Sequence, residues 1–358
     1  MGTMAQTFRA IVSGQRQGAL PSLARGALRI AECPYAWVMR RRNEAYDSGR
    51  RPSYAAGVPV ISVGNLTLGG TGKTPLVEWI ARRLSQDGLR VCIVSRGYKG
   101  TNSAGNDEAL ELGQRLPDVP HVQNPDRVAG AATAVKEHHA QVILLDDGFQ
   151  HRRLKRNLDV VLLDALEPFG FDHVFPRGTL REPLSGLARA QAVVLSRADM
   201  IEAAARDAIR GRVQCLAPEA VWAETIHAPQ QLRSVASTAP LESLAGQNVA
   251  AFCGIGNPAG FRHTLASCQL NVVAWREFPD HHGYGTKDAE DLARWAATSG
   301  AAAVVCTHKD LVKLQTEQLG KIPLWALEIG IQFLEGEQEL RALLESSLGA
   351  TSRKQNYD

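Results

Sequence analysis

Residues 58–74 read VPVISVGNLTLGGTGKT, and this stretch decides the fold of the chain. An apolar strand pattern breaks into a glycine-rich turn that ends in Gly72-Lys73-Thr74, and a helix is predicted from Pro75 through the amphipathic segment LVEWIARRL. Glycine lets the backbone approach a phosphate chain closely, and a helix N-terminus presents N–H donors with a partial positive charge. The stretch therefore predicts a phosphate loop for a nucleotide polyphosphate.

The pattern G-x-x-x-x-G-K-[ST] assigns roles within this loop. Lys73 is predicted to reach the β- and γ-phosphates of ATP, and the hydroxyl of Thr74 to ligate Mg²⁺. The first glycine of the pattern falls on Thr67, so we expect Gly64 to supply the flexible point instead. The predicted nucleotide-binding residues are Gly69, Gly70, Thr71, Gly72, Lys73 and Thr74.

The composition is that of a globular protein of two α/β domains. The chain has 358 residues, of which 44% are hydrophobic and 22% charged, and no uncharged apolar run approaches the roughly 18 residues of a membrane span. Its six cysteines are scattered without CxxC spacing, which predicts reduced thiols and argues against a zinc site.

The N-terminal segment is strongly basic. Residues 1–51 hold nine arginines against three acidic residues, a net charge of +6, while the rest of the chain sums to −3. Arginines interleaved with Leu, Ile and Trp are typical of an interfacial segment, so we expect a membrane-associating arm that binds anionic lipid. The alternative is a solvated arm or a helix packed on the main domain, because Pro21 and Pro34 break the periodicity. No secretory signal and no nucleic-acid platform are predicted.

Short apolar runs alternate with helical stretches along most of the remaining chain. Because the runs are continuously apolar, they predict a mostly parallel sheet with helices on both faces, and ligands at the carboxyl ends of its strands. The runs lie at 58–63, 90–95, 141–146, 159–164 and 191–196, and then at 248–253, 271–278, 301–306 and 323–329. We therefore predict an arm at 1–50, a phosphate-loop domain at 51–232, a smaller α/β domain at 233–349 and a polar tail at 350–358, with 227–238 as the connector.

The segment VILLDDGFQH places two carboxylates at the end of an apolar strand. Asp146 and Asp147 stand where a phosphate-loop enzyme holds Mg²⁺ or its waters, although Asp-Asp-Gly also closes strands for purely structural reasons. Gln150 and His151 follow on the same loop and either contact phosphate or cap the turn.

Phosphoryl transfer to a hydroxyl needs a group that takes its proton. Asp107, at the start of a predicted helix, is one candidate, although Asp at that position is often a helix cap. The loop Asp280-His281-His282 supplies a partner, because an Asp–His pair tunes a base toward neutral pH. Asp107, Asp147, His281 and His282 remain alternatives for the general base.

Arginines gather in PRGTLREP, at 176–183. Arg177 and Arg181, with Arg127 from the preceding NPDR segment, are predicted to clamp phosphate groups of the acceptor or the transferring group, and a solvent-facing loop is the alternative. Two weaker signals carry no prediction: SRAD at 196–199 loosely resembles a guanine-reading element, and GIGNPA at 254–259 fits a dinucleotide fingerprint that often arises by chance.

Taken together, the chain resembles the tetraacyldisaccharide 4′-kinases of lipid A synthesis. The segments that carry the resemblance occur in the order GNLTLGGTGKTP, SRGYKG, NDEA, DR, DDGFQH, PRGTLREP, GIGNP, FPDHHGY and THKDLVKL. The resemblance implies a kinase that moves the γ-phosphate of ATP, with Mg²⁺, to the 4′-hydroxyl of a tetraacylated glucosamine disaccharide 1-phosphate. It implies that residues 51–232 form the kinase domain, that Asp146 and Asp147 serve the metal, and that Asp107 with His281 forms the base pair.

The resemblance also implies a peripheral protein at the cytoplasmic face of the inner membrane, whose partner is the lipid A disaccharide precursor and for which no obligate protein partner is inferred. Two rival functions keep parts of this interpretation. A phosphate-loop NTPase acting as a switch or assembly factor at the membrane would hydrolyse ATP regardless of lipid. A nonenzymatic membrane-binding module would not bind nucleotide at all.

Overall fold

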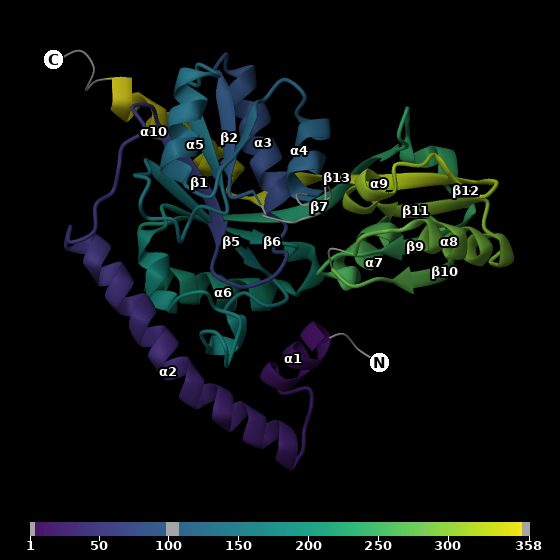
Figure 1. The fold of residues 1–358 in the computed structure, drawn as a ribbon, viewed down its shortest axis with the longest axis horizontal. Coiled ribbons are helices and arrows are strands. Elements are labelled where there is room, and N and C mark those ends of the chain that lie inside the picture. Colours follow the sequence, from purple (N-terminus) through teal and green to yellow (C-terminus); the bar gives the residue numbers. More distant parts are fainter. Residues whose placement is uncertain (1–3, 98–106, 281, 353–358) are drawn as a thin grey trace. The chain divides into compact units, whose positions relative to one another are not determined.

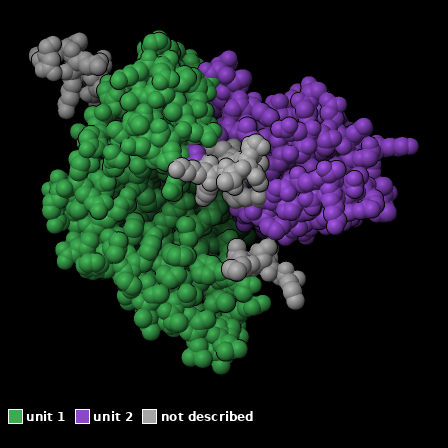
Figure 2. Space-filling view, in the orientation of Figure 1, with its two compact units in different colours: residues 1–96, 119–225, 333–358 green, residues 97–118, 226–332 purple. Residues whose placement is uncertain are grey.

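The structure is a computed structural model that describes residues 4–97, 107–280 and 282–352. The chain forms two compact units, coloured separately in Figure 2. Unit 1 comprises residues 1–96, 119–225 and 333–358, and unit 2 comprises residues 97–118 and 226–332. Three segments are grouped differently from the sequence-based division, because 97–118 and 226–232 belong to unit 2 and 333–349 belongs to unit 1.

Unit 1 contains a parallel sheet (Figure 1). Its strands are β1 (Val60–Asn65), β2 (Val91–Ser95), β3 (His121–Gln123), β4 (Val142–Asp146), β5 (Leu158–Asp164), β6 (Ala192–Ser196) and the first part of β7 (Val221–Arg233). They lie in the order β7-β6-β5-β1-β4-β2-β3, and each neighbouring pair is parallel. The predicted parallel phosphate-loop sheet is confirmed, with β1 flanked by β4 and β5 as a central strand.

Helices cover this sheet and account for its buried faces. The helices of unit 1 are α1 (Met4–Val12), α2 (Ala19–Asp47), α3 (Lys73–Gln86), α5 (Arg127–Lys136), α6 (Ala203–Leu216) and α10 (Glu337–Ser352), with 3₁₀ turns η1 (Gly170–Asp172), η2 (Leu184–Arg189) and η3 (Ala198–Met200). Val193 and Leu195 of β6 share a cluster with Ile209 and Val213 of α6. On β2, Cys92 and Val94 share another cluster with alanines of α5. The main strands are buried throughout because helices occupy both faces.

Unit 2 is a smaller α/β unit. Its strands are the rest of β7, β8 (Thr238–Ala239), β9 (Asn248–Cys253), β10 (Asn271–Glu277), β11 (Ala303–Thr307), β12 (Gln318–Leu319) and β13 (Ile322–Glu335), of which the last residues belong to unit 1. Strands β10, β9, β11 and β13 pair in parallel in that order. Its helices are α4 (Asp107–Arg115), α7 (Pro258–Ser267), α8 (Thr286–Thr298) and α9 (His308–Leu314), with the turn η4 (Leu241–Leu244).

The alternation of side chains along β9 explains why unit 2 is also layered. Val249 and Ala251 pack with Leu265 of α7, whereas Ala250 and Phe252 pack with residues of α8. Adjacent residues therefore contact helices on opposite faces of the sheet, as the sequence pattern predicts.

The first part of the predicted connector at 227–238 is a strand rather than a segment without secondary structure, because β7 runs from Val221 to Arg233. Most side chains from 226 to 231 are only partly buried, so the apolar pattern of a strand is missing from this part of the sequence. Long strands such as β7 and β13 have residues in both units.

The N-terminal arm is mainly helical. Helix α2 runs over 29 residues and includes Pro34 in its interior, so the prolines that break the sequence periodicity do not end the helix. None of the helices in the described part of the chain combines the length and apolar character needed to span a bilayer.

Candidate active site

The glycine-rich loop joins the end of β1 to the start of α3. Gly69 and Gly72 have φ angles of 112° and 81°, a region that favours glycine, and Gly72 directly precedes the helix. Asn65, the last residue of β1, fixes the loop from inside: its Nδ2 donates to the carbonyl of Thr67 at 3.0 Å and to Oγ1 of Thr71 at 3.1 Å. The sequence pattern of a phosphate loop therefore lies between a strand and a helix, as the motif requires.

Thr67 departs from the glycine of the pattern for a structural reason. It forms a β-bridge with Leu180, the amide of Leu68 donates to the carbonyl of Thr179 at 2.7 Å, and the amide of Arg181 donates to the carbonyl of Leu66 at 2.7 Å. Residues 66–68 are thus extended and paired with residues 179–181. An extended, paired position suits a β-branched residue better than glycine.

Gly64 meets a different requirement from the one predicted. A Cβ at Gly64 would lie 2.6 Å from Cβ and 2.8 Å from the backbone nitrogen of Phe149, which is fully buried. The absence of a side chain at Gly64 therefore lets the Asp146–Phe149 turn pack directly on β1.

The two adjacent acids differ in environment. Asp146 is the last residue of β4 and is buried, whereas Asp147 follows it with φ 52° and has a side chain that is 38% exposed. Oδ1 of Asp147 lies 3.4 Å from Nζ of Lys73, and its two oxygens lie 2.9 and 2.8 Å from Nη1 of Arg181. Burial raises the pKa of Asp147, but Lys73 and Arg181 outweigh it and lower this pKa to about 2. Asp147 is thus an anion held between two cations.

Arg181 connects three segments that are far apart in the sequence. Besides binding Asp147, its Nε donates to the carbonyl of Thr67 at 3.1 Å. The arginine of PRGTLREP therefore contacts both the phosphate loop and the Asp-Asp-Gly turn. Arg177, four residues earlier, points elsewhere: its Nη1 donates to the carbonyl of Val12 at 3.0 Å, at the C-terminal end of α1.

Arg127 begins α5 and is buried. Its helix is capped by Asp126, which accepts from the amide of Val128. Burial lowers the pKa of Arg127, while the charges of Asp147 and Asp146 act in the opposite direction. Its Nε has no hydrogen-bond partner among the described residues. Arg127 is thus a buried cation whose nearest electrostatic partners include both acids of the turn.

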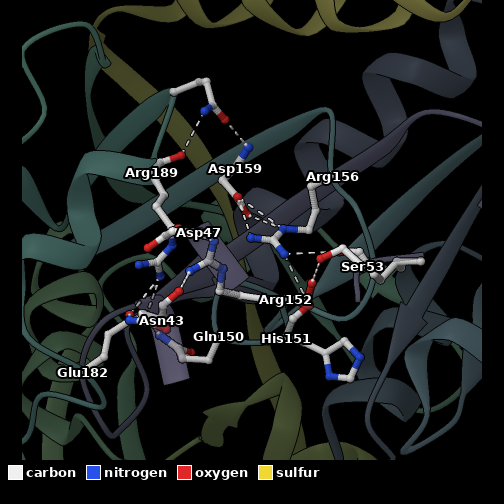
Figure 3. Close-up of polar contacts among 12 residues, drawn as sticks. Asn43, Asp47, Ser53, Gln150, His151, Arg152, Arg156, Asp159, Glu182 and Arg189 are labelled. Atoms are coloured by element: carbon white, nitrogen blue, oxygen red, sulfur yellow. Dashed lines mark hydrogen bonds and ion pairs between the residues drawn. The ribbon is translucent and has the colours of Figure 1, made fainter. Parts of the chain in front are cut away.

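Gln150 is engaged within the fold, whereas Nε2 of His151 is buried without a hydrogen-bond partner among the described residues. Nε2 of Gln150 donates to the carbonyl of Asn65 at 3.0 Å. It also donates to Oε1 of Glu182 at 3.1 Å (Figure 3). Burial, reinforced by Arg127, lowers the pKa of His151 to about 4, so its imidazole is neutral at physiological pH. In this structure Gln150 joins β1 to the 182 segment and has the contacts of a supporting residue.

Glu182 and Asn43 form a polar cluster that sequence reasoning missed. Glu182 is fully buried and binds Nη2 of Arg189 at 2.8 and 2.9 Å, and it accepts from Nδ2 of Asn43 at 2.6 Å (Figure 3). Arg42, which precedes Asn43 on α2, donates to the carbonyl of Gln150 at 2.6 Å. Helix α2 is therefore fastened to the loops beside Asp147. The local sequence around these residues does not predict these contacts.

The discounted SRAD segment supports the phosphate loop. Oγ of Ser196 donates to the carbonyl of Thr71 at 2.8 Å, and Nη2 of Arg197 donates to the carbonyl of Gly70 at 3.2 Å. Nη1 of Arg197 also pairs with Asp164 at 2.6 Å, across the ends of the neighbouring strands β5 and β6. The SRAD segment, which loosely resembles a nucleotide-binding element, therefore holds the backbone of the phosphate loop in place.

The proposed base pair lies partly outside the described residues. Asp107 is the first residue of α4, but its side chain is outside them, as is His281 altogether. His282 is described: its ring stacks on Phe278 with centroids 4.8 Å apart, and its Nε2 lies 3.3 Å from Asp288. The pairing of Asp107 with His281 remains a prediction.

The parallel sheet, the glycine-rich loop between β1 and α3, and the acidic turn after the neighbouring strand β4 define a phosphate-loop nucleotide-binding protein. The family model described as tetraacyldisaccharide-1-P 4′-kinase, LpxK, matches residues 24–349. The chain belongs to this family.

Individual relatives agree with this assignment. The tetraacyldisaccharide 4′-kinase of Anaeromyxobacter sp. (strain K) is 40% identical over 357 residues, which cover 94% of each chain. That of Halothermothrix orenii is 37% identical over 319 residues, covering 80% of this chain and 83% of the relative. A crystal structure of LpxK from Aquifex aeolicus in complex with ATP has a TM-score of 0.73 and 30% identity, and the match covers 91% of this chain and 99% of that one.

Proposed function

We propose that the site formed by Lys73, Asp147 and Arg181 carries out the reaction for which the family is named. By its family the chain is an ATP-dependent kinase. The reaction transfers the γ-phosphoryl group of ATP to the 4′-hydroxyl of a tetraacylated glucosamine disaccharide 1-phosphate. The observation that carries the proposal is the network in which Asp147 lies 3.4 Å from Lys73 and 2.8 Å from Arg181 beside the glycine-rich loop.

The donor set next to the loop fits magnesium. Thr74 offers a hydroxyl, and Asp146 and Asp147 offer carboxylates. Mg²⁺ prefers oxygen ligands and is commonly held by one or two carboxylates together with substrate phosphates. When bound, the ion supplies charge neutralisation on the transferring group.

The cations of the chain have complementary tasks. Lys73 would leave Asp147 for the β- and γ-phosphates when ATP binds, since phosphate oxygens are the stronger anionic partner for its ammonium. Arg181 would keep Asp147 ionised and oriented, as its contact with the carbonyl of Thr67 anchors the guanidinium to the loop. Arg127 would face the negative charge that accumulates during transfer.

The proton of the acceptor must also be removed. The 4′-oxygen forms a bond to the γ-phosphorus, the bond from that phosphorus to the bridging oxygen breaks, ADP leaves, and the hydroxyl proton passes to a base. We propose Asp107 with His281 as that base pair.

The test combines product analysis with matched variants. With γ-labelled ATP, Mg²⁺ and the disaccharide monophosphate, label should appear on the 4′-position of the sugar in proportion to ADP. Lys73→Ala should lose ATP binding, whereas Lys155→Ala, at an exposed position of the same unit, should not. Asp107→Ala should bind ATP normally while kcat falls by about 10²-fold or more. Release of free phosphate at a rate indifferent to the lipid would contradict the proposal.

We further propose that the protein works peripherally at the cytoplasmic face of the inner membrane, through α2. This helix exposes Leu20, Leu23 and Ile30 by 80%, 70% and 76%. Deleting the arm is a poor test, because Tyr35 of the same helix donates to the carbonyl of Arg181 at 2.9 Å. Changing the three exposed residues to Ser should instead weaken binding to anionic vesicles without altering ATP affinity.

A control for that experiment is Leu334→Ser, an exposed apolar residue of the same unit at 47%. It should leave vesicle binding unchanged. Equal vesicle binding by the wild type and the triple α2 variant would remove α2 as the membrane contact.

A further inference from the structure

We propose that α9, which begins inside the segment THKDLVKL, is the platform that holds helix α4 and the chain on both sides of residue 281 in register, and that His308 is a positioning residue for the helix that starts at Asp107. The inference rests on the proposed function, because it assigns a task to residues around Asp107 and His281. All the contacts that carry it lie within unit 2.

His308 fastens the C-terminal end of α4. Its side chain is 1% exposed, its Nε2 lies 2.9 Å from Oε1 of Gln114, and its Nδ1 lies 3.1 Å from Nε of Arg115. Arg115 is itself buried, and its Nη1 donates to the carbonyl of Ile329 on β13 at 2.8 Å. The helix that begins at Asp107 is therefore tied at its other end to α9 and to the sheet.

The protonation state of this contact follows from its donors. Arg115 has only N–H groups to offer, so Nδ1 of His308 must accept, and the ring proton must sit on Nε2, where it donates to the amide oxygen of Gln114. A neutral imidazole fits, because burial, and after it the charge of Arg115, lowers the pKa of His308. Both ring nitrogens thus bind adjacent residues of α4, which fixes the rotation of that helix as well as its position.

The residues on either side of position 281 are held by the same helix. Lys313 Nζ donates to the carbonyl of His282 at 3.1 Å, and Lys309 Nζ lies 3.5 Å from Asp280. Asp310 is fully buried and accepts from the hydroxyl of Tyr284 at 2.9 Å. The chain on both sides of residue 281 is therefore attached to α9.

Asp310 also locks the start of α9 to the sheet. It accepts from the backbone amide of Gly254 at 3.1 and 3.2 Å and from the hydroxyl of Thr307 at 2.6 Å. The GIGNP and THKD segments thereby acquire a shared role: Gly254 and Asp310 seat α9 on the ends of β9 and β11. Because α9 is held in this way, it fixes the distance between α4 and the residues on either side of position 281, which are bonded to it.

This arrangement matters because proton transfer depends on distance. A general base must come within about 2.6–3.2 Å of the proton donor, and a misplacement of about 1 Å costs on the order of 10²-fold in rate. We therefore expect loss of the His308 contact to lower turnover without lowering nucleotide affinity, whose residues lie in unit 1.

The experiment compares His308→Leu, which removes both ring nitrogens, with His308→Gln, which keeps one acceptor and one donor. Thr264→Val is the matched control, because Thr264 is a buried polar residue of unit 2 on α7, whose hydroxyl donates to the carbonyl of Gly260 in the same helix. Each full-length protein is assayed for kcat, KM for ATP and amide hydrogen exchange, alone and combined with Asp107→Ala.

The positioning role predicts a specific set of results. His308→Leu should lower kcat by about 10- to 100-fold with KM for ATP unchanged, and it should speed exchange in α4 but not in α7. His308→Gln should recover much of the rate, and Thr264→Val should retain wild-type kcat. In the Asp107→Ala background, His308→Leu should cause little further loss, because the two residues act through one step.

Two outcomes would overturn the inference and can be told apart. If Asp107→Ala is inactive but His308→Leu turns over like the wild type, the positioning role alone is wrong. The same holds if the losses of the two variants multiply, since His308 would then act independently of Asp107. If Asp107→Ala itself retains wild-type kcat, the base assignment fails and the platform has no catalytic partner to position, whatever the exchange data show for α4.

Discussion

Neutralising the buried carboxylate of Glu182 should destabilise unit 1 more than any conservative surface change. Glu182 has no exposed surface, and its two oxygens accept from Arg189, Asn43 and Gln150. Every one of these groups is a donor. The substitution Glu182→Gln preserves the shape of the side chain but replaces one acceptor oxygen with an NH₂ group that faces donors.

The loss of stability in Glu182→Gln depends on the donor groups that are left without an acceptor. Arg189 is 17% exposed, so removing its partner leaves a largely buried and uncompensated cation. Breaking a buried ion pair on one side costs about 3–5 kcal/mol, and we expect the lower end because part of the guanidinium reaches solvent. An unsatisfied donor among Asn43 and Gln150 adds a cost of the same sign, of about 1 kcal/mol or more.

Hydrogen exchange of the slowest amides in β5 and β6 measures this loss, with the strands of unit 2 as an internal reference. Glu219→Gln, at an exposed position of unit 1, is the matched control and should stay within about 0.5 kcal/mol of the wild type. Wild-type protection in Glu182→Gln would refute the reasoning, because it would mean that the carboxylate charge is not needed to hold α2 and the Gln150 loop together.

Two further predictions concern packing and pH. Gly64→Ala should destabilise the protein by about 1–3 kcal/mol in urea unfolding, since its Cβ would collide with Phe149. Gly70→Ala is the control and should not destabilise it, because a Cβ at Gly70 would meet no atom of the described residues within 4 Å. Equal stabilities of the two variants would contradict the close approach of the turn to β1. Burial lowers the pKa of His121 from 6.5 to about 4 and, with Arg115, lowers that of His308. The unfolded chain therefore takes up protons first, so stability should be complete above about pH 6.5 and fall as the pH drops toward 4. A stability that is flat across this window would exclude buried neutral histidines.

Local patterns predicted much of this molecule. The phosphate loop, the apolar strands and the position of Asp146 and Asp147 at a strand end all follow from periodicity and residue type over a dozen positions. Such features depend on backbone geometry and burial within one strand, turn or helix, which neighbouring residues largely determine. The same reasoning extends to the alternation along β9.

Long-range contacts settled the rest. Arg177 and Arg181 are equivalent by sequence, yet only Arg181 binds Asp147, because residues 179–181 pair with residues 66–68 and so carry that side chain to the loop. The Glu182 cluster and the hold of His308 on α4 join residues more than a hundred positions apart. In the sequence, a buried polar residue cannot be distinguished from an exposed one. Its role is decided by the tertiary structure, because its hydrogen-bond partners come from distant strands and helices.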